Sequence, residues 1–344
     1  MTDSELGPIA SPTLARTVVA DRGDAGRRVD LVLRRHLTDI SKATRTRVQS
    51  WIEGGRVTIN GRLVQRVSSR TAVGDEITIH FPGDVRSAPA LPEQGPLDCL
   101  YEDDALLVVN KPAGIVSHPT FRHPTGSLLN RLLWHARTWP SDQRPSLVGR
   151  LDKLTSGAVV VAKTSRAHAR LQRILASSRS VKSYLAVVYG PMAKEHGEIS
   201  LRLRRDAGDR RRVVATSDDG LTSLTRFERL AHADAEGCAV ALVRCQLATG
   251  RMHQIRVHLT ASGWPLIGDP KYGEPRWETA RAGRVRDALQ AFDRQALHAW
   301  RVSFSHPFTG DNIEVTAPVP ADMGLLLEVC ELPLPLLAKG FGGA

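Results

Sequence analysis

One carboxylate in a polar turn directly before a short buried strand constrains this chain more than any other feature. Asp152 lies in the segment 149–163, and the apolar run 158–162 in the second half of this segment is bounded by Gly157 and Lys163. A short continuous apolar run of this kind predicts a strand buried on both faces. A turn fixed on such a strand can hold a carboxylate in one place, as catalysis requires. The alternative is an ordinary turn, because Asp, Thr, Ser and Gly are common turn residues.

Further motif-like strings lie on both sides of this turn. They are Val-Asn-Lys-Pro-Ala-Gly-Ile-Val-Ser-His-Pro at 109–119, Lys-Ser-Tyr-Leu-Ala-Val-Val-Tyr-Gly at 182–190, Thr-Gly-Arg-Met-His-Gln-Ile-Arg-Val-His-Leu at 249–259, Gly-Trp-Pro-Leu-Ile-Gly-Asp-Pro-Lys-Tyr-Gly at 263–273 and His-Pro-Phe-Thr-Gly at 306–310. Together with Arg-Leu-Asp-Lys-Leu-Thr-Ser-Gly at 150–157, these strings resemble the motifs of the RluA family of pseudouridine synthases. The resemblance covers about residues 97–320.

The resemblance implies that the chain isomerises uridine within RNA to pseudouridine. In this reaction the uracil detaches from C1′, rotates and reattaches through C5, with no redox step and no atom from outside. We therefore expect neither a cofactor nor a metal ion, and a single carboxylate, Asp152, can serve as nucleophile or base. The sequence leaves open whether Asp152 attacks the sugar, attacks the base or removes a sugar proton.

The resemblance assigns catalytic roles to four residues: Asp152, Tyr184, Arg256 and Arg150. The ring of Tyr184 is expected to lie against the target base, and such stacking contributes about 1–3 kcal/mol. Arg256 is expected to pair with the catalytic carboxylate and orient it, although an arginine at this place can also bind phosphate. Arg150, two residues before Asp152 and on the same side of an extended segment, is expected to help displace the flipped nucleotide.

A second set of residues is expected to bind RNA. Four of them lie in the motifs and are expected to line the RNA cleft, with a structural role as the alternative: Lys111, His118, Arg251 and His253. The arginines between residues 202 and 212 surround the turn 206–209, which predicts a basic hairpin. In this hairpin Arg210 and Arg211 are expected to contact phosphates, and a solvated hairpin is the alternative.

The first part of the chain predicts a small domain of its own. Residues 1–26 are polar with several Gly and Pro and predict a flexible leader, after which residues 27–82 predict an α-α-β domain. Apolar residues recur there at helical spacing twice, and Ser41 is expected to cap the second helix. A hairpin around Asn60-Gly61 and a strand at 76–81 follow. This arrangement resembles an S4 RNA-binding domain.

The charge of this domain favours an RNA partner. Residues 27–82 hold eleven Lys or Arg against five Asp or Glu, a net charge of +6, while the whole chain carries +11 and has a pI near 10.0. Lys and Arg on one face bind polyanions by releasing counterions from phosphates. Arg45 and Arg47, off the apolar face of the second helix, are the expected phosphate contacts. The alternative is a solvated charged face.

The rest of the chain predicts a larger second domain. Residues 83–96 are rich in Pro and Gly and predict a linker, residues 97–330 the catalytic domain and residues 331–344 a tail. Short β-branched strands outnumber helices, which predicts an α+β domain around a mainly antiparallel mixed sheet. Strands are expected at 106–109, 158–161, 184–188, 239–246 and 313–316, and a helix at 165–177.

Several classes of protein are disfavoured by composition. The four cysteines lie far apart without Cys-x-x-Cys spacing, so neither a zinc site nor a disulfide scaffold is expected: Cys99, Cys238, Cys245 and Cys330. The N-terminus lacks a signal-peptide pattern, and no run of about eighteen apolar residues predicts a membrane span. We expect a soluble, cytoplasmic monomer.

The sequence as a whole predicts an RNA pseudouridine synthase. Large-subunit ribosomal RNA is the expected substrate, as for S4-bearing relatives, and tRNA stays open. Gly149 stands where many relatives have His, and Met252 where they usually have Thr, so the site specificity of a relative cannot be transferred. A non-catalytic RNA-binding or ribosome-assembly protein is one alternative, which the intact Asp, Tyr and Arg set disfavours. A nucleoside or glycoside hydrolase is another, but the motifs offer no evident second carboxylate.

Overall fold

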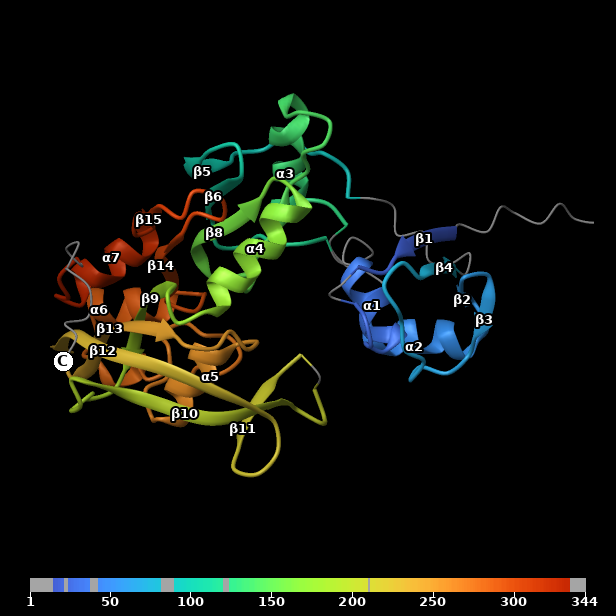
Figure 1. The fold of residues 1–344 in the computed structure, drawn as a ribbon. Helices are drawn as coiled ribbons and strands as arrows, with labels where there is room; N and C mark the ends of the chain where they lie inside the picture. Colours follow the sequence, from blue (N-terminus) through green and yellow to red (C-terminus); the bar gives the residue numbers. More distant parts are fainter. Residues whose placement is uncertain are drawn as a thin grey trace, which may run out of the picture. The chain divides into compact units, whose positions relative to one another are not determined.

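The chain folds into two compact units. The computed structural model describes residues 15–21, 24–37, 43–81, 90–119, 124–209 and 211–334. The units are Met1–Pro89 and Ala90–Ala344, and Figure 1 shows the helices and strands of each. None of the helices in these described ranges is long and apolar enough to cross a bilayer.

The first unit is a four-stranded antiparallel sheet that packs against two helices. Its elements are β1 (Ala15–Val19), α1 (Val29–His36), α2 (Arg45–Glu53), β2 (Val57–Ile59), β3 (Arg62–Val64) and β4 (Glu76–His80). The strand order is β1-β4-β2-β3. Apolar residues of both helices pack with those of β2 and β4, and the ring of Trp51 meets that of Phe81 edge-on at 5.5 Å. The predicted helix pair, hairpin and strand are confirmed.

Two predictions for this unit are wrong in detail. Residues 15–19, assigned to a flexible leader, form β1 and pair with β4 from Ala15 opposite His80 to Val19 opposite Glu76. Strand β1 forms because it pairs with β4, and the apolar periodicity of residues 15–19 alone does not show this pairing. Helix α2 begins at Arg45, and the hydroxyl of Thr44 caps it by accepting a hydrogen bond from the amide of Arg47 (3.4 Å). Ser41, the predicted cap, lies outside the described residues.

The second unit is a large, mainly antiparallel sheet with helices packed against it. Its strands are β5 (Asp98–Glu102), β6 (Leu106–Lys111), β7 (Ser146–Leu147), β8 (Ser156–Ala162), β9 (Val181–Tyr189), β10 (His196–Arg205), β11 (Val213–Thr216), β12 (Leu221–Ala235), β13 (Cys238–Leu247), β14 (Leu297–Ser305) and β15 (Asn312–Thr316). Its α-helices are α3 (Leu128–His135), α4 (Ser165–Ala176), α5 (Gln254–Ala261), α6 (Arg284–Ala291) and α7 (Ala321–Val329). The main strand order is β11-β10-β12-β13-β9-β14-β8-β6-β5. This is the predicted α+β architecture.

Strand β8 is buried on both faces, as its continuous apolar sequence predicts. Val160 and Ala162 pack on one face with Ala167 and Leu171 of α4. The alternate residues of β8 pack on the opposite face with α3: Val159 and Val161 with Leu128 and Leu132. Two helices therefore clamp the strand that directly follows the turn of Asp152, so the base of this turn is rigid.

The boundaries of the second unit are wider than the sequence predicts. Residues 90–96, assigned to the linker, bind to α3. The amide of Asn130 donates from Nδ2 to the carbonyl of Leu91 (2.7 Å), and Arg131 donates to the carbonyl of Pro96 (3.0 Å). Leu332, assigned to the tail, is buried in the core that includes α6 and α7. These hydrogen bonds and this burial involve residues that are distant in the sequence, and the composition of a segment does not reveal them.

Strands β8 and β14 pair in parallel, and a glycine makes this contact possible. Ser156 lies opposite His298, and Gly157 lies opposite Ala299. Gly157 has φ +114°, and a Cβ built on it would lie 2.2 Å from the carbonyl oxygen of Ala299. Only glycine therefore lets β14 approach the strand that carries the Asp152 turn.

We predict that Gly157→Ala destabilises the protein by about 3 kcal/mol, because the added methyl group meets the β14 backbone and the φ angle is strained for alanine. Urea denaturation followed by circular dichroism measures this change. The control is Gly324→Ala inside α7, where an added Cβ would have no atom within 4 Å. This control should be stabilised by about 0.5–1 kcal/mol, since alanine favours helix. Equal unfolding midpoints for the two variants would contradict the prediction.

Candidate active site

Asp152 is held from both sides by the segment that follows β6. The hydroxyl of Ser117 donates to the carbonyl of Leu151 (3.0 Å) and accepts from its amide (3.3 Å). The carbonyl of Lys153 accepts from the amide of Gly114 (2.9 Å). The neighbours of Asp152 on both sides are thus bonded to residues 114–117, while 29% of the Asp152 side chain stays exposed. This backbone clamp, together with β8, gives the carboxylate a fixed and reachable position.

Lys111 belongs to the same clamp and does not line an RNA surface. Its side chain is fully buried, and its ammonium donates to the carbonyls of Pro112 (2.8 Å), Ile115 (3.0 Å) and Lys153 (3.2 Å). Burial lowers the pKa of Lys111 to about 7, and the nearby charge of Asp152 opposes this shift. The expectation that Lys111 contacts RNA is wrong in this structure. Three backbone acceptors hold its charged end inside the protein.

Arg256 on α5 joins two carboxylates. Its Nη1 donates to Oδ2 of Asp152 at 2.8 Å, while Nε and Nη2 donate to the two oxygens of Asp269 at 2.7 Å each. Arg256 and Asp269 are only 6% and 1% exposed, so their pair is desolvated and bidentate. The planar fork of the guanidinium therefore fixes where Nη1 meets Asp152.

Asp269 is fixed in turn by its own loop. One of its oxygens also accepts from the amides of Lys271 (2.9 Å) and Tyr272 (3.1 Å). Burial raises the pKa of Asp269, but hydrogen bonds from Arg256 and its positive charge outweigh burial and hold this pKa below its usual value. Sequence reasoning gave Asp269 no role. The Gly-Asp-Pro-Lys-Tyr-Gly string could have marked Asp269 as a candidate, but the string does not show which arginine pairs with this aspartate.

His253 faces the same carboxylate from the start of α5. Its Nε2 lies 3.8 Å from Oδ2 of Asp152, and its Nδ1 is hydrogen-bonded to the hydroxyl of Tyr272 at 2.7 Å. Burial lowers the pKa of His253, while the charge of Asp152 opposes the shift. The structure thus places His253 beside Asp152, where sequence reasoning expected a residue of the RNA cleft.

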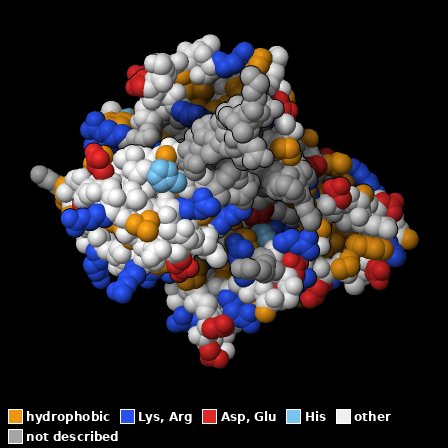
Figure 2. All heavy atoms as spheres, turned by 90° about the vertical axis from the view of Figure 1, so that its right-hand side faces the viewer, with side chains coloured by type: hydrophobic (Ala, Val, Ile, Leu, Met, Phe, Trp, Pro, Cys, Tyr) orange, Lys and Arg blue, Asp and Glu red, His pale blue; other side chains and the backbone are white. Residues whose placement is uncertain are grey.

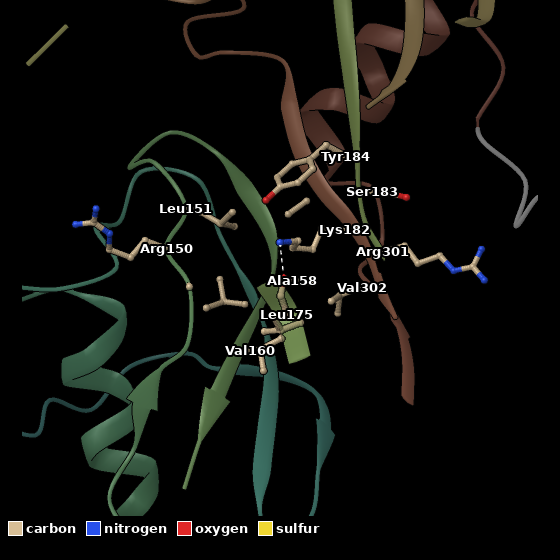
Figure 3. Close-up of a pocket in the computed structure, with 13 residues that line it drawn as sticks. Arg150, Leu151, Ala158, Val160, Leu175, Lys182, Ser183, Tyr184, Arg301 and Val302 are labelled. Atoms are coloured by element: carbon tan, nitrogen blue, oxygen red, sulfur yellow. Dashed lines mark hydrogen bonds between the residues drawn. The ribbon is translucent and has the colours of Figure 1, made fainter. Parts of the chain in front are cut away.

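Tyr184 on β9 borders a pocket next to the Asp152 loop. Burial, and then the charge of Asp152, raise the pKa of Tyr184 to about 12, so its phenol is neutral at ordinary pH. Figure 3 shows its ring beside Leu151, and Arg150 directed away from it. The residues that line this pocket come from the Asp152 loop, β8, α4, β9 and β14: Gly149, Arg150, Leu151, Ala158, Val159, Val160, Leu175, Lys182, Ser183, Tyr184, Ala299, Arg301 and Val302. An apolar floor beside an aromatic ring suits an unstacked base.

Comparison with known proteins decides what kind of enzyme this geometry belongs to. Residues 105–261 match the RNA pseudouridylate synthase family, and residues 27–77 match the S4 domain. The chain is 39% identical to a Bacillus subtilis protein called "Uncharacterized RNA pseudouridine synthase YlyB", over 90% of this chain and 96% of that protein. This chain belongs to the RluA family of RNA pseudouridine synthases. It is an isomerase, and its substrate is RNA.

Two further comparisons agree. The enzyme is 38% identical to ribosomal large subunit pseudouridine synthase D of Neisseria meningitidis serogroup B, over 90% of this chain and 80% of that protein. The structure of human RNA pseudouridylate synthase domain containing 1 superposes with a TM-score of 0.53 at 28% identity, and the match covers 72% of this chain and 94% of that chain. The predicted family and the predicted S4 domain are confirmed.

Three more of the predicted site residues are Arg150, predicted to be catalytic, and Arg251 and His118, predicted to bind RNA. Arg150 and Arg251 are exposed, and Arg251 donates to the carbonyl of Thr222 (3.3 Å). His118 is half-buried, and burial, with the charge of Arg150, lowers its pKa. Figure 2 shows Lys and Arg side chains scattered among acidic and apolar ones on the visible surface.

The basic hairpin predicted near residues 202–212 is formed by β10 and β11. Arg211 is exposed and pairs with Asp209 in its own turn at 2.9 Å, while Arg210 lies outside the described residues. In the first unit, Arg45 is exposed and Arg47 half-buried. Each predicted RNA-binding residue that the structure describes is therefore at least partly exposed, with the exception of Lys111.

We predict that Asp269→Asn costs about 3 kcal/mol of stability at neutral pH, because Arg256 loses its buried anionic partner. The pKa of Asp269 is lowered in the folded enzyme, so its stabilising effect is complete above the unfolded pKa and disappears as pH falls through the folded pKa. The stability difference between wild type and variant should therefore shrink below about pH 4.

Urea denaturation between pH 3 and pH 7 measures this difference, with Glu198→Gln as the control. Glu198 pairs with Arg226 at 2.8 Å, but both side chains are 54% exposed. This exposed pair should contribute less than about 1 kcal/mol. A pH-independent difference for Asp269→Asn would show that ionisation of Asp269 is not what stabilises the site.

Proposed function

We propose that this enzyme isomerises specific uridines of large-subunit ribosomal RNA, and that Asp152 carries the reaction. The bond between C1′ and N1 breaks, the bond between C1′ and C5 forms, C5 loses its proton and N1 gains one. The observation that carries the proposal is Asp152 itself, a partly exposed carboxylate oriented by the buried guanidinium of Arg256 at 2.8 Å.

The surroundings of Asp152 favour isomerisation over hydrolysis. Arg256 also binds a second carboxylate, that of Asp269. The Asp269 side chain is 1% exposed, and both of its oxygens are bonded to the guanidinium of Arg256. A glycoside hydrolase needs a second carboxylate that can reach the substrate. Asp269 cannot take that role, because it is enclosed by Arg256 and two backbone amides.

The other residues divide between the flipped base and the RNA around it. The ring of Tyr184 lies against the uracil, and its neutral phenol keeps that contact uncharged. Exposed Arg150 takes the place that the base leaves, which compensates part of the cost of flipping. His118, Arg251 and Arg211 contact the RNA around the target. All of these residues come from one chain, so we infer that a monomer is sufficient.

Large-subunit ribosomal RNA is the substrate that the comparisons favour. The Neisseria meningitidis relative is called a ribosomal large subunit pseudouridine synthase. Its sequence is 38% identical to this chain over a match that covers 90% of this chain. The S4 domain adds a basic module that neutralises phosphates without reading sequence. We infer that Arg45 and Arg47 of α2 supply part of this contact, with selectivity set by the shape of the RNA.

The first experiment measures tritium release from ribosomal RNA and tRNA labelled at uridine C5. Wild type should release tritium from large-subunit ribosomal RNA and form pseudouridine. Asp152→Asn should lose at least about 1,000-fold in rate, because the nucleophile or base is gone. Asp142→Asn, an exposed aspartate in the turn before β7, is the matched control and should keep the wild-type rate. An active Asp152→Asn would refute the role of Asp152, and release from tRNA alone would refute the ribosomal substrate.

A second experiment tests the S4 contact through its salt dependence. Replacing Arg45 and Arg47 together by Gln should reduce the slope of log affinity against log salt by about 1–2, because up to two phosphate contacts are lost. The rate at saturating RNA should stay unchanged. Glu53→Gln on the same helix is the control, and it should not reduce the slope. An unchanged slope in the double variant would show that these arginines form a solvated face only.

A further inference from the structure

A continuous chain of polar contacts links the basic hairpin to Asp152. The amide of Val213, the first residue of β11, donates to the hydroxyl oxygen of Tyr272 at 2.8 Å. The same hydroxyl is bonded to Nδ1 of His253 at 2.7 Å. On the other side of the imidazole, Nε2 lies 3.8 Å from Oδ2 of Asp152. One side chain, that of His253, therefore separates Tyr272 from the proposed catalytic carboxylate, and Tyr272 also contacts the hairpin.

The contacts on both sides of the imidazole favour one tautomer of His253. The carboxylate of Asp152 lies on the Nε2 side and favours a hydrogen there, which leaves Nδ1 to accept from the hydroxyl of Tyr272, while the oxygen of this hydroxyl accepts from the amide of Val213. A neutral imidazole that accepts at Nδ1 carries its hydrogen on Nε2. That hydrogen faces Asp152. The hydroxyl of Tyr272 thus directs an N–H of His253 towards the carboxylate, at an Nε2–Oδ2 distance of 3.8 Å that gives an electrostatic contact and not a direct hydrogen bond.

The backbone of His253 adopts a conformation that is uncommon for a residue other than glycine. His253 has φ +55° and ψ +19°, in the left-handed region, and its side chain does not cap α5. Such a conformation is costly for a residue other than glycine and is kept where surrounding contacts impose it. The rings of His253 and Tyr272 meet edge-on at 5.5 Å, and both side chains are largely buried.

Tyr272 also belongs to the loop that orients Arg256. Its amide donates to Asp269 (3.1 Å), and its ring lies 4.9 Å from the guanidinium carbon of Arg256. Beside it, the ammonium of Lys271 donates to the carbonyl of Arg211 in the hairpin turn (3.1 Å). One short loop therefore contacts the hairpin and both of the side chains that face Asp152, those of Arg256 and His253.

We propose that Tyr272 is a positioning residue of the isomerisation, whose hydroxyl fixes His253 in the tautomer that presents Nε2–H to Asp152 and ties this imidazole to the basic hairpin. The inference rests on the proposed role of Asp152. Tyr272 itself does not touch the substrate. It acts through His253, so its loss should change the rate of the chemical step more than the binding of RNA.

The decisive variant is Tyr272→Phe, which removes the hydroxyl and keeps the ring that packs against Arg256. We expect about a tenfold lower kcat and a KM for RNA within about twofold of wild type, since the hydrogen bond that orients His253 beside Asp152 is lost. The control is Tyr189→Phe, a buried tyrosine on the opposite face of β9 from Tyr184, which should keep the wild-type kcat.

The pH profile separates this role from a merely structural one. The hydroxyl of Tyr272 donates to neutral His253, so its removal favours the imidazolium and should move the acid limb of kcat to higher pH. The other charged groups facing His253 stay in place. Asp152 and Asp269 favour the imidazolium, whereas Arg256 and Lys271 oppose it.

A second variant, His253→Gln, keeps the proposal testable if Tyr272→Phe folds poorly. Glutamine retains an N–H donor at the end of its side chain but does not titrate. We expect it to keep at least about ten times the kcat of His253→Ala and to lose the acid limb caused by the imidazole. In the His253→Gln background, Tyr272→Phe should have little further effect, because the two residues act as one unit.

Three results would overturn the inference while Asp152→Asn remains inactive. They are a wild-type kcat and pH profile in Tyr272→Phe, a full additional loss when Tyr272→Phe is added to His253→Gln, and equal rates for His253→Gln and His253→Ala. An inactive wild type, or an active Asp152→Asn, would instead refute the proposed function itself. The two failures are therefore distinguishable in one set of assays.

Discussion

The arrangement of the whole site depends on one guanidinium shared by two carboxylates. Arg256 is buried, and a buried charge is costly unless it is paired with good geometry. Asp269 supplies that pair through two bonds of 2.7 Å, and the third donor of Arg256 is left to orient Asp152. Because Asp269 balances the charge of Arg256, the three groups together keep one negative charge. That charge lies at Asp152, the partly exposed member of the set. The enzyme thus orients its carboxylate without neutralising it.

The fold provides the rigidity that this arrangement requires. Helices α3 and α4 clamp β8 from its two faces, Gly157 admits β14 alongside, and residues 114–117 bind the backbone on both sides of Asp152. Arg256 and Asp269 come from α5 and the loop that follows it, about a hundred residues further along the chain. A rigid strand and a rigid helix meet at the site. Because the strand and the helix are fixed, one hydrogen bond of 2.8 Å from Arg256 is enough to set the orientation of the Asp152 carboxylate.

Much of the fold could be predicted from local sequence, and the failures share one cause. Strand β8, helix α4 and the helix pair of the S4 domain were predicted, because apolar periodicity and turn residues are local signals. Strand β1 was missed, since it depends on pairing with β4, about sixty residues away. Lys111 was expected at the RNA surface, but its ammonium is buried against three carbonyls. The carbonyl groups that surround Lys111 belong partly to segments distant in the sequence. A sequence motif identifies the lysine but does not show which carbonyl groups surround it.

The sequence by itself determined the family, the reaction class, the basic S4 domain and the identity of Asp152, Tyr184 and Arg256 as candidates. These properties follow from residue types in a fixed order, which a single chain displays directly. Only the tertiary structure decided that Asp269 holds Arg256, that His253 turns towards Asp152, and that Tyr272 connects this imidazole to the hairpin. Direction and distance between side chains arise when distant segments pack, because a hydrogen bond needs its two atoms within about 3 Å and correctly aligned.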